Sequence, residues 1–371
     1  MHDLSVPEHL AGAILTIDLD ALVDNYLDLR ARAGGAVTGG VVKADAYGLG
    51  MAEVAPALAD AGCEVFFVAH VSEGVALRAL LPNAEIHILN GLLPGAGGAY
   101  RDHRLVPVLG SLLEIDHWIE FCGTSPLPCD LHVDTGMLRL GLPTDELTVL
   151  AKDRARLDKL NVNLVMSHFA SADEEGTDQN ARQLAAFTEA REKLSMGRSC
   201  FANSAGIFLG GDYLGDVVRP GVALYGINPT PWTDNPMRTV ATLKAKILQV
   251  RQAAPGETVS YGATHTIDHP TRIATVAAGY ADGYKRSLSG VGCGYIAGRR
   301  VPVLGRVTMD LTMFDVGAVA QEDCKPGDWI ELMGPNISVD EVAASAGTIG
   351  YEILTGMGRR YHRSYVGGGN E

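Results

Sequence analysis

Several features are scarce in this 371-residue chain, and each absence excludes a class of protein. No apolar run approaches the ~18 residues of a membrane-spanning helix. No basic and apolar leader opens the chain, so we expect a cytoplasmic protein without a membrane contact. Basic residues are outnumbered, with 30 Lys and Arg against 44 Asp and Glu, which leaves a formal net charge of −14. That balance excludes the positive surface needed to bind nucleic acid or an anionic membrane.

Cysteine pairs and metal-binding motifs are also missing. The six cysteines include no CxxC pair, so we expect buried thiols in a reducing compartment rather than a disulfide framework. His265 and His269 belong to no HExxH motif, and we predict no metal site. A hydrolytic serine is unsupported because there is no GxSxG motif. Aromatic residues make up only 6% while glycines number 44, which indicates many tight turns or backbone packed close to a ligand.

Short apolar runs alternate with amphipathic segments over the first 235 residues. Helices are predicted at 16–32, with Asp18 as its N-cap, and at 51–62, 111–121, 144–157 and 180–194. About eight strand–helix units in this length are typical of a TIM barrel. A doubly wound open sheet is the alternative, which is weakened by the lack of a GxGxxG sequence after the first strand. The predicted strands are 38–43, 64–70, 85–90, 105–109, 129–134, 162–168, 200–203 and 216–219.

The pattern changes near residue 236, after three prolines that suit a linker. From there, apolar and polar residues alternate between glycine turns, which predicts a mainly β domain with a few short helices. We therefore predict an N-terminal α/β TIM barrel at 13–235 followed by a mainly β C-terminal domain at 236–371. Residues 1–12 precede the barrel, and we expect them to pair with the β domain.

Polar residues follow the predicted barrel strands, where TIM barrels place their active sites. Each of these residues alone has an ordinary explanation: the lysine could be solvated, and the histidine could be a core residue whose ring nitrogens are hydrogen-bonded. Lys43 directly follows an apolar strand, where burial would lower its pKa and favour a neutral amine. Such an amine suits either an aldolase-type reaction or a pyridoxal phosphate enzyme. The strand-end residues are Lys43, Arg139, His168, Asn203, Ser204 and Arg219.

Eight motifs occur in order along nearly the whole chain: VVKADAYGLG, VDTGMLRLG, ANSAG, RPGVALYG, VSYGATHT, GYADGY, GRVTMD and YEILTGMGRR. Together they resemble the bacterial alanine racemases. VKADAYGLG is a specific motif, whereas ANSAG alone is weak. The resemblance implies a pyridoxal 5'-phosphate enzyme with a TIM barrel and a β domain, in agreement with the division predicted above. It also implies a homodimer that interconverts L- and D-alanine, for cell-wall synthesis or for alanine catabolism.

The resemblance also implies which residues hold the cofactor. Lys43 would bond to it covalently. Arg219 would donate to the pyridine nitrogen and, because arginine stays protonated, would keep that nitrogen unprotonated. The resulting carbanion would be short-lived, which suits racemisation. The other residues implied at the cofactor are Tyr47, His168, Asn203, Ser204, Gly221, Val222 and Tyr351.

Two bases are implied on opposite faces of the substrate, namely Lys43 and Tyr261 of the partner subunit. Because a free tyrosine has a pKa of ~10, nearby cations must make its ionised form accessible, and Arg219 and His168 are the candidates. The substrate would be positioned by Arg139, Met309 and Asp310, at an entrance narrowed by Tyr280 and Tyr351.

Two positions depart from the family pattern. His132 stands where many members have a lysine that is often carbamylated, so we hypothesise that Arg139 is held by another anion, such as chloride, or by a nearby carboxylate. Thr308 stands where a cysteine is common, which we interpret as a neutral change. A racemase for other amino acids, a decarboxylase of related fold and a noncatalytic pyridoxal phosphate protein are the alternatives.

Overall fold

The computed structural model describes residues 6–368, which form two compact units. The barrel unit contains Val23–Leu224 and Asn228–Met237. The β unit contains the residues before Val23, the short segment Tyr225–Ile227 and the residues from Arg238 onward.

The barrel unit is built on a parallel sheet with the order β2-β10-β9-β8-β7-β6-β5-β4-β3. β2 (Val37–Thr38) pairs with β10 and β3 (Gly40–Val41) pairs with β4. Since only Gly39 separates them, β2 and β3 are halves of one strand, and the sheet closes as a barrel. The TIM barrel fold is confirmed. Its other strands are β4 (Val65–Val68), β5 (Glu85–Ile88), β6 (Val106–Leu109), β7 (Pro128–His132), β8 (Asn161–Met166), β9 (Arg198–Asn203) and β10 (Val217–Arg219).

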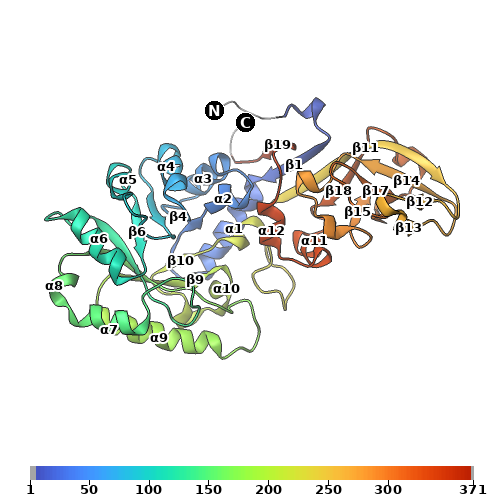
Figure 1. The fold of residues 1–371 in the computed structure, drawn as a ribbon. Helices are drawn as coiled ribbons and strands as arrows, with labels where there is room; N and C mark the ends of the chain where they lie inside the picture. The colour runs from blue at the N-terminus through green and yellow to red at the C-terminus, as the bar shows by residue number, and fades with distance from the viewer. Residues whose placement is uncertain (1–5, 369–371) are drawn as a thin grey trace. The chain divides into compact units, whose positions relative to one another are not determined.

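Helices follow the barrel strands and lie around them (Figure 1). In most of them, buried apolar residues recur at helical spacing, such as Ile115 and Trp118 in α6. The helices are α1 (Leu19–Arg32), α2 (Lys43–Tyr47), α3 (Met51–Asp60), α4 (Val71–Leu80), α5 (Gly97–Asp102), α6 (Leu112–Cys122), α7 (Thr144–Lys152), α8 (Arg154–Leu157), α9 (Gln179–Leu194) and α10 (Ser204–Leu209).

Glutamates at the third position of α4, α6 and α7 tie each helix to the loop of the preceding strand–helix unit. Glu73 accepts a hydrogen bond from Ala44 N–H at 2.6 Å, and Glu114 accepts one from Leu92 N–H at 2.9 Å. Glu146 accepts one from Leu112 N–H at 2.7 Å. A carboxylate is the strongest acceptor available for such amides, and here it also lies at a helix N-terminus. These hydrogen bonds therefore link successive strand–helix loops within the barrel.

Two predicted helices were wrong in their bounds. The helix predicted at 16–32 begins at Leu19, because residues 16–18 complete the strand β1 (Ala13–Asp18). Asp18 is nevertheless the cap, since its Oδ1 accepts from Ala21 N–H at 2.9 Å. The helix predicted at 144–157 is split at Asp153, whose carboxylate caps α8 by accepting from Arg156 N–H.

The β unit is organised around β11 (Ala241–Ala253), which pairs with β1, β14 and β18. β1 also pairs in parallel with β19. The described part of the N-terminal segment contacts this sheet, because Gly12 C=O accepts from Lys246 N–H at 2.8 Å; residues 1–5 lie outside the described residues. The other strands are β12 (Thr258–Val259), β13 (His265–Thr266), β14 (Thr271–Val276), β15 (Cys293–Ile296), β16 (Arg299–Pro302), β17 (Thr312–Asp315), β18 (Trp329–Met333) and β19 (His362–Val366).

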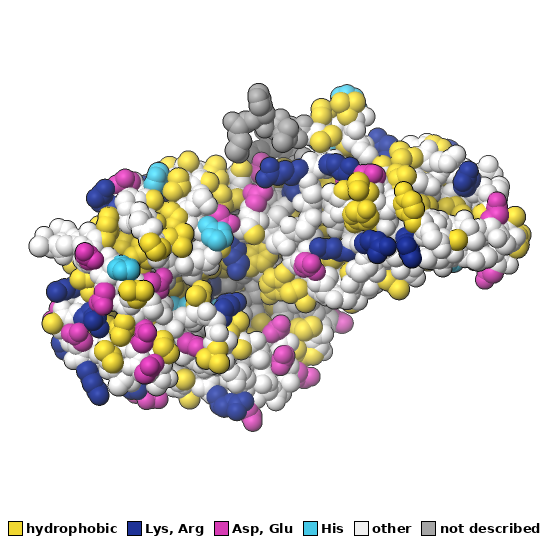
Figure 2. Space-filling model, in the orientation of Figure 1, with side chains coloured by type: hydrophobic (Ala, Val, Ile, Leu, Met, Phe, Trp, Pro, Cys, Tyr) yellow, Lys and Arg dark blue, Asp and Glu magenta, His cyan; other side chains and the backbone are white. Residues whose placement is uncertain are grey.

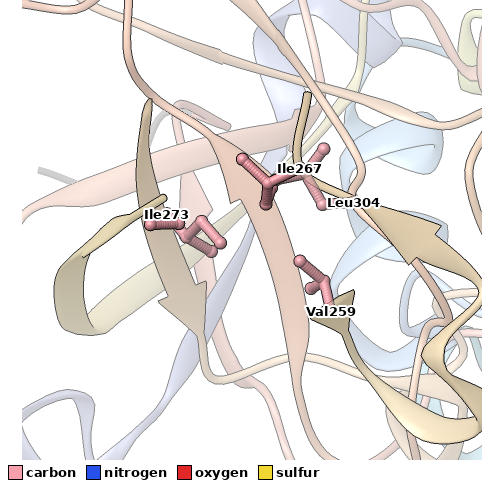
Figure 3. Packing of buried hydrophobic residues seen from close by; sticks show 5 residues of the cluster. Val259, Ile267, Ile273 and Leu304 are labelled. Carbon is pink, nitrogen blue, oxygen red and sulfur yellow. The ribbon is translucent and has the colours of Figure 1, made fainter. Parts of the chain in front are cut away.

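A small apolar cluster supports the hairpin β12–β13 of the β unit. Val259 and Ile267, from the two arms of the hairpin, pack with Ile273 and Leu304 (Figure 3), and Ala253 completes the cluster. Each of these side chains is at most 7% exposed. Burial of this kind contributes about 1.5–3 kcal/mol per large side chain. The cluster therefore anchors the loop between the two short strands, residues 260–264.

Residues 6–368 were compared with two requirements, the length of a membrane-spanning helix and the side chains of a metal site. No helix in that range has the length and apolar character needed to cross a bilayer. His, Cys, Asp and Glu side chains in the same range form no group of three or more that could hold a metal ion. On the visible face of the barrel unit, acidic and basic side chains are interspersed (Figure 2).

Candidate active site

Lys43 lies at the rim of the barrel unit and begins an unusual turn. The next four residues, Ala44 to Tyr47, all have φ between 52° and 56°, a left-handed helical turn. None is glycine, and this conformation costs roughly 1–2 kcal/mol per L-residue. Backbone of this kind persists only where the surrounding structure holds it, and it clusters at functional sites. The turn is thus the strongest structural indication of a site at Lys43.

The amine of Lys43 is in an environment that favours its neutral form. Burial, together with the positive charges of Arg139 and Arg219, lowers the pKa of Lys43, and Glu73 opposes this by raising it. The expected depression of the pKa is therefore present in the folded chain. A neutral amine at this position can act as a nucleophile or a base.

Arg219 is 5% exposed and is held by neutral acceptors at the end of β10. Nη1 donates to Cys200 C=O at 2.8 Å and approaches Cys200 Sγ at 3.0 Å. Nη2 donates to Ser167 C=O at 2.8 Å and to His168 Nδ1 at 3.3 Å. Since arginine can only donate, Nδ1 of His168 must be unprotonated and its proton must lie on Nε2. The geometry fixes both the guanidinium and the tautomer of the histidine.

The prediction that His168 supplies a positive charge was wrong. Burial and the nearby Arg219 and Arg139 lower the pKa of His168 well below its usual value, so the ring is neutral at pH 7. Burial and the same two arginines lower the pKa of His132 to about 4. The cations at this rim are therefore arginines, and the two histidines are neutral.

Ser204, Gly221 and Tyr47 lie in close contact with one another. Ser204 Oγ accepts from Gly221 N–H at 2.9 Å and from Ala223 N–H at 3.2 Å. With both lone pairs used, the hydroxyl proton is the group that can bond to an added acceptor. A Cβ at Gly221 would lie 2.5 Å from the hydroxyl oxygen of Tyr47, so only glycine fits. Asn203 has a structural role, because its Oδ1 caps α10 by accepting from Gly206 N–H at 2.9 Å.

The loop that carries Arg139 is shaped by one carboxylate. Asp134 Oδ1 accepts from Gly136, Met137 and Leu138 N–H groups at 2.9, 3.0 and 3.2 Å. Leu138 has a positive φ and is 90% exposed. Arg139 is exposed as well. The loop thus presents a leucine and an arginine outward from the barrel unit.

Tyr261 lies at the tip of the hairpin β12–β13 in the β unit and is 73% exposed. Its neighbours Ser260 and Ala263 have positive φ values of 67° and 50°. Ser260 is held by a hydrogen bond from its hydroxyl to Arg306 C=O at 2.8 Å. A strained tip that exposes a large aromatic ring indicates a functional contact rather than a folding role.

Tyr280, Met309 and Asp310 belong to two loops of the β unit that are bonded together. Tyr280 N–H donates to Thr308 C=O at 2.9 Å. Arg360 bonds to Asp310 at 2.8 Å and to Asp282, in the Tyr280 turn, at 2.6 Å. Asp310 is therefore ion-paired within its own unit.

Three large side chains of the β unit that were predicted at the site are partly exposed. Met309 and Tyr280 are 53% and 42% exposed, and Tyr351, in α12 (Gly350–Thr355), is 39% exposed.

The hydroxyl of Thr308 closes a turn, since it accepts from Leu311 N–H at 3.1 Å and donates to Leu311 C=O at 2.9 Å. This bond gives a physical reason for threonine at that position. The sequence interpretation missed Glu73, although a glutamate three residues after His70 is the signal of a helix start.

Comparison with known proteins agrees with this arrangement. The family model "Alanine racemase, N-terminal domain" matches residues 17–229, and "Alanine racemase, C-terminal domain" matches residues 240–365. Two Agrobacterium fabrum proteins, named biosynthetic and catabolic alanine racemase, are 47% and 45% identical to the chain. The matches cover 95% and 96% of this chain and 93% and 92% of those proteins. Both role names thus occur among relatives of similar identity.

A crystal structure of alanine racemase from Bartonella henselae with covalently bound pyridoxal phosphate superposes with a TM-score of 0.92 and 39% identity. It covers 96% of this chain and 100% of its own. The matched fold, the two matched domains and the identity over nearly the full length establish that this chain belongs to the alanine racemase family.

Proposed function

We propose that this chain interconverts L- and D-alanine with pyridoxal 5'-phosphate, as a cytoplasmic homodimer in which Lys43 and Tyr261 are the two bases. Membership of the family supports the reaction and the cofactor. The observation that carries the assignment to residues is the left-handed turn at the barrel rim, which begins at a partly buried amine whose pKa is lowered by its burial and by Arg139 and Arg219.

The residues present fit a phosphorylated cofactor. Because Gly221 has no side chain, the Tyr47 hydroxyl can lie directly against its backbone, next to the hydroxyl of Ser204. Hydroxyls and backbone N–H groups near the last strands of a TIM barrel are a common phosphate site. We assign Ser204, Tyr47, Gly221 and Val222 to the phosphate, with Tyr351 as a further hydroxyl. We assign Asn203 to stabilising the N-terminus of α10, because its side-chain oxygen already accepts the Gly206 N–H.

The chemistry divides between the cofactor and the protein. When bound, pyridoxal phosphate withdraws the electrons that loss of the Cα proton leaves on the substrate. Lys43 takes or returns that proton on one face, and Tyr261 does so on the other. Arg219 would donate to the ring nitrogen of the bound cofactor, and its hydrogen bonds to the Cys200 and Ser167 carbonyls restrain the guanidinium. Because Arg219 cannot act as an acid here, the withdrawal stays moderate and fast return of the proton is favoured.

The neutral state of His168 changes how Tyr261 would be activated. With Nδ1 bonded to Arg219, His168 can donate from Nε2. A donor that is itself bonded to a guanidinium stabilises an acceptor with negative charge, and it therefore lowers the pKa of a phenol placed there. We assign this role to the pair of His168 and Arg219, rather than to a charged histidine.

The homodimer is supported by exposure in the β unit. Tyr261, Met309 and Tyr280 are large side chains that a single chain leaves 73%, 53% and 42% exposed. A twofold dimer buries the same surface on both copies and would complete two sites at once. We assign Arg139, Met309 and Asp310 to binding of the substrate carboxylate and its surroundings, and Tyr280 and Tyr351 to the entrance.

The test is an isotope-exchange assay in D₂O. Purified protein loaded with pyridoxal phosphate should convert each alanine enantiomer into the other and place deuterium at Cα, without pyruvate or CO₂. The same assay across amino acids of increasing size should give alanine the highest kcat/KM. Release of CO₂ would indicate a decarboxylase instead. Absence of exchange with any amino acid would contradict the proposed function.

A further inference from the structure

The left-handed turn after Lys43 needs a specific restraint from outside itself. Four residues at roughly 1–2 kcal/mol each make it one of the least favourable stretches of backbone in the barrel unit. Internal bonds recover part of this, such as Gly48 N–H to Ala44 C=O at 2.8 Å. Asp45 Oδ1 holds the far end of the turn by accepting from Met51 N–H at 2.8 Å. The near end, next to Lys43, is held by a residue of another helix.

Glu73 of α4 holds that near end. Its Oε1 accepts from Ala44 N–H at 2.6 Å, in the peptide group that joins Ala44 to Lys43. Its Oε2 accepts from Ala69 and His70 N–H groups at 2.8 and 2.9 Å. One carboxylate therefore bridges the turn after β3 and the turn after β4. Fixing the Lys43–Ala44 peptide plane also fixes the direction in which the Lys43 side chain leaves the backbone.

We propose that Glu73 is a positioning residue for Lys43, which aims the amine at the reacting atoms by restraining the left-handed turn. The proposal rests on the proposed function for the identity of the reaction, but the restraint itself concerns only this chain. A displacement of a reacting group by about 1 Å can cost around a hundredfold in rate. A loosened turn would allow a displacement of that size at the end of a four-carbon side chain.

The charge of Glu73 acts on Lys43 as well. Burial and the two arginines lower the pKa of Lys43, whereas the Glu73 carboxylate raises it. Glu73 thus keeps the amine from becoming too weak a base, while its position keeps the amine directed. The two effects separate experimentally, because aspartate preserves the charge but is one methylene too short to bridge both turns.

Glu114 provides a matched control within the same barrel. Like Glu73, Glu114 is the third residue of its helix. It bridges the turn before α6 and the loop after β5, the preceding strand of the barrel. It accepts from Leu92 N–H at 2.9 Å and from Gly110 N–H at 2.7 Å. The loop that it holds carries none of the proposed catalytic residues. A purely structural role would therefore make the two glutamates equivalent.

The experiment compares Glu73→Gln with Glu114→Gln in the loaded enzyme. A glutamine has one acceptor oxygen, so each variant loses part of its bridge, and both should lose similar thermal stability. We expect kcat for alanine to fall about 10–100-fold in Glu73→Gln and less than about threefold in Glu114→Gln. Equal losses of kcat in the two variants would overturn the proposal.

A second readout uses the cofactor-free protein. Labelling of Lys43 by acetic anhydride, measured by mass spectrometry across pH, reports the midpoint of its titration. The midpoint should move to lower pH in Glu73→Gln and stay in place in Glu73→Asp and Glu114→Gln, while Glu73→Asp still loses kcat relative to Glu114→Asp. An unmoved midpoint in Glu73→Gln, or full kcat in Glu73→Asp, would also overturn the proposal.

Should the wild type not racemise alanine, the proposed function fails, and the labelling midpoint still decides whether Glu73 acts on Lys43. The Asp pair decides the matter if Glu73→Gln does not fold.

Discussion

The barrel unit and the β unit present their proposed catalytic residues in opposite ways. Arg219 and Ser204 of the barrel unit are 5% and 4% exposed and are hydrogen-bonded to backbone groups of Cys200 and Gly221 in the same unit. Tyr261 and Met309 of the β unit are 73% and 53% exposed. The difference teaches that the proposed cofactor-binding residues are preorganised within one chain, whereas the proposed second base lies on a surface that a single chain leaves exposed.

Both units also hold strained backbone next to a proposed base, but by different means. The Lys43 turn is restrained by carboxylates that accept amide hydrogens. The Tyr261 tip is anchored by the apolar cluster of Val259, Ile267, Ile273, Leu304 and Ala253. Directional bonds fix orientation, whereas apolar packing fixes position and leaves the tip itself accessible. Breaking one base at a time should therefore separate the contributions of the two units.

Replacing Lys43 with alanine should have the largest effect. The variant loses both the covalent attachment of the cofactor and one base, so racemisation should fall by at least about 10⁴-fold in both directions. The measurement is the initial rate from each alanine enantiomer by polarimetry or chiral chromatography. Lys244→Ala, at an exposed position in β11, is the control and should retain full rate. Residual activity near that of the control would contradict the assignment of Lys43.

Replacing Tyr261 with phenylalanine should have a smaller and asymmetric effect. Loss of the hydroxyl removes proton transfer on one face only, so abstraction from one enantiomer should fall about 10²–10³-fold. Exchange of the Cα proton of the other enantiomer should persist, because Lys43 remains. The measurement is deuterium incorporation into each enantiomer separately. An equal loss for both enantiomers, or no loss, would contradict the two-base assignment.

Mixing the two variants tests whether Tyr261 acts in the partner subunit. After exchange of subunits, a mixed dimer of Lys43→Ala and Tyr261→Phe would contain one site with both bases intact. Random pairing should restore about a quarter of the sites. Tyr295→Phe removes a tyrosine hydroxyl from the strand β15 of the same unit and is the control. By itself it should racemise alanine at the rate of the unaltered protein. A mixture without recovery would mean that Lys43 and Tyr261 act within one chain.

The sequence predicts most of the barrel because its strands are short apolar runs bounded by turns. The first strand of the β unit was missed, because Leu15, Leu19 and Leu22 also fit the spacing of the helix that follows. The left-handed turn could not be predicted, since Ala-Asp-Ala-Tyr contains no glycine and the conformation depends on Glu73, which lies 29 residues from Ala44. Local propensity says nothing about such a distant restraint.

The residues of the site were easier to name than their charge states. Lys43, Arg219 and Ser204 stand at strand ends in the sequence, and the structure places them at the ends of β3, β10 and β9. The neutral state of His168 depends on its burial beside Arg219, which lies 51 residues away.

The buried charges of the barrel predict a dependence of its stability on pH. His87 and Asp130 are both fully buried, and His87 Nδ1 lies 2.5 Å from Asp130 Oδ2. Burial alone would lower the pKa of His87, but attraction to Asp130 and Glu85 outweighs it and raises the pKa to about 9. A pair of this kind has no counterpart in the apolar cluster of the β unit.

Because the pKa of His87 is higher in the folded chain than in the unfolded one, its protonation stabilises the fold fully below pH ~6.5, and this stabilisation is lost as the pH rises towards 9. The free energy of unfolding should fall by up to ~3 kcal/mol across that range. Urea unfolding of the cofactor-free protein at a series of pH values measures it, and Asp130→Asn should flatten the slope because the charge that holds the proton is gone. His269→Asn, which alters an exposed histidine beside Asp268, should leave the slope unchanged. Hydrogen exchange should locate the loss in peptides of β7 and not in those of β14, because only the barrel interior contains this pair; an equal loss in both would mean that the pH dependence does not arise from His87.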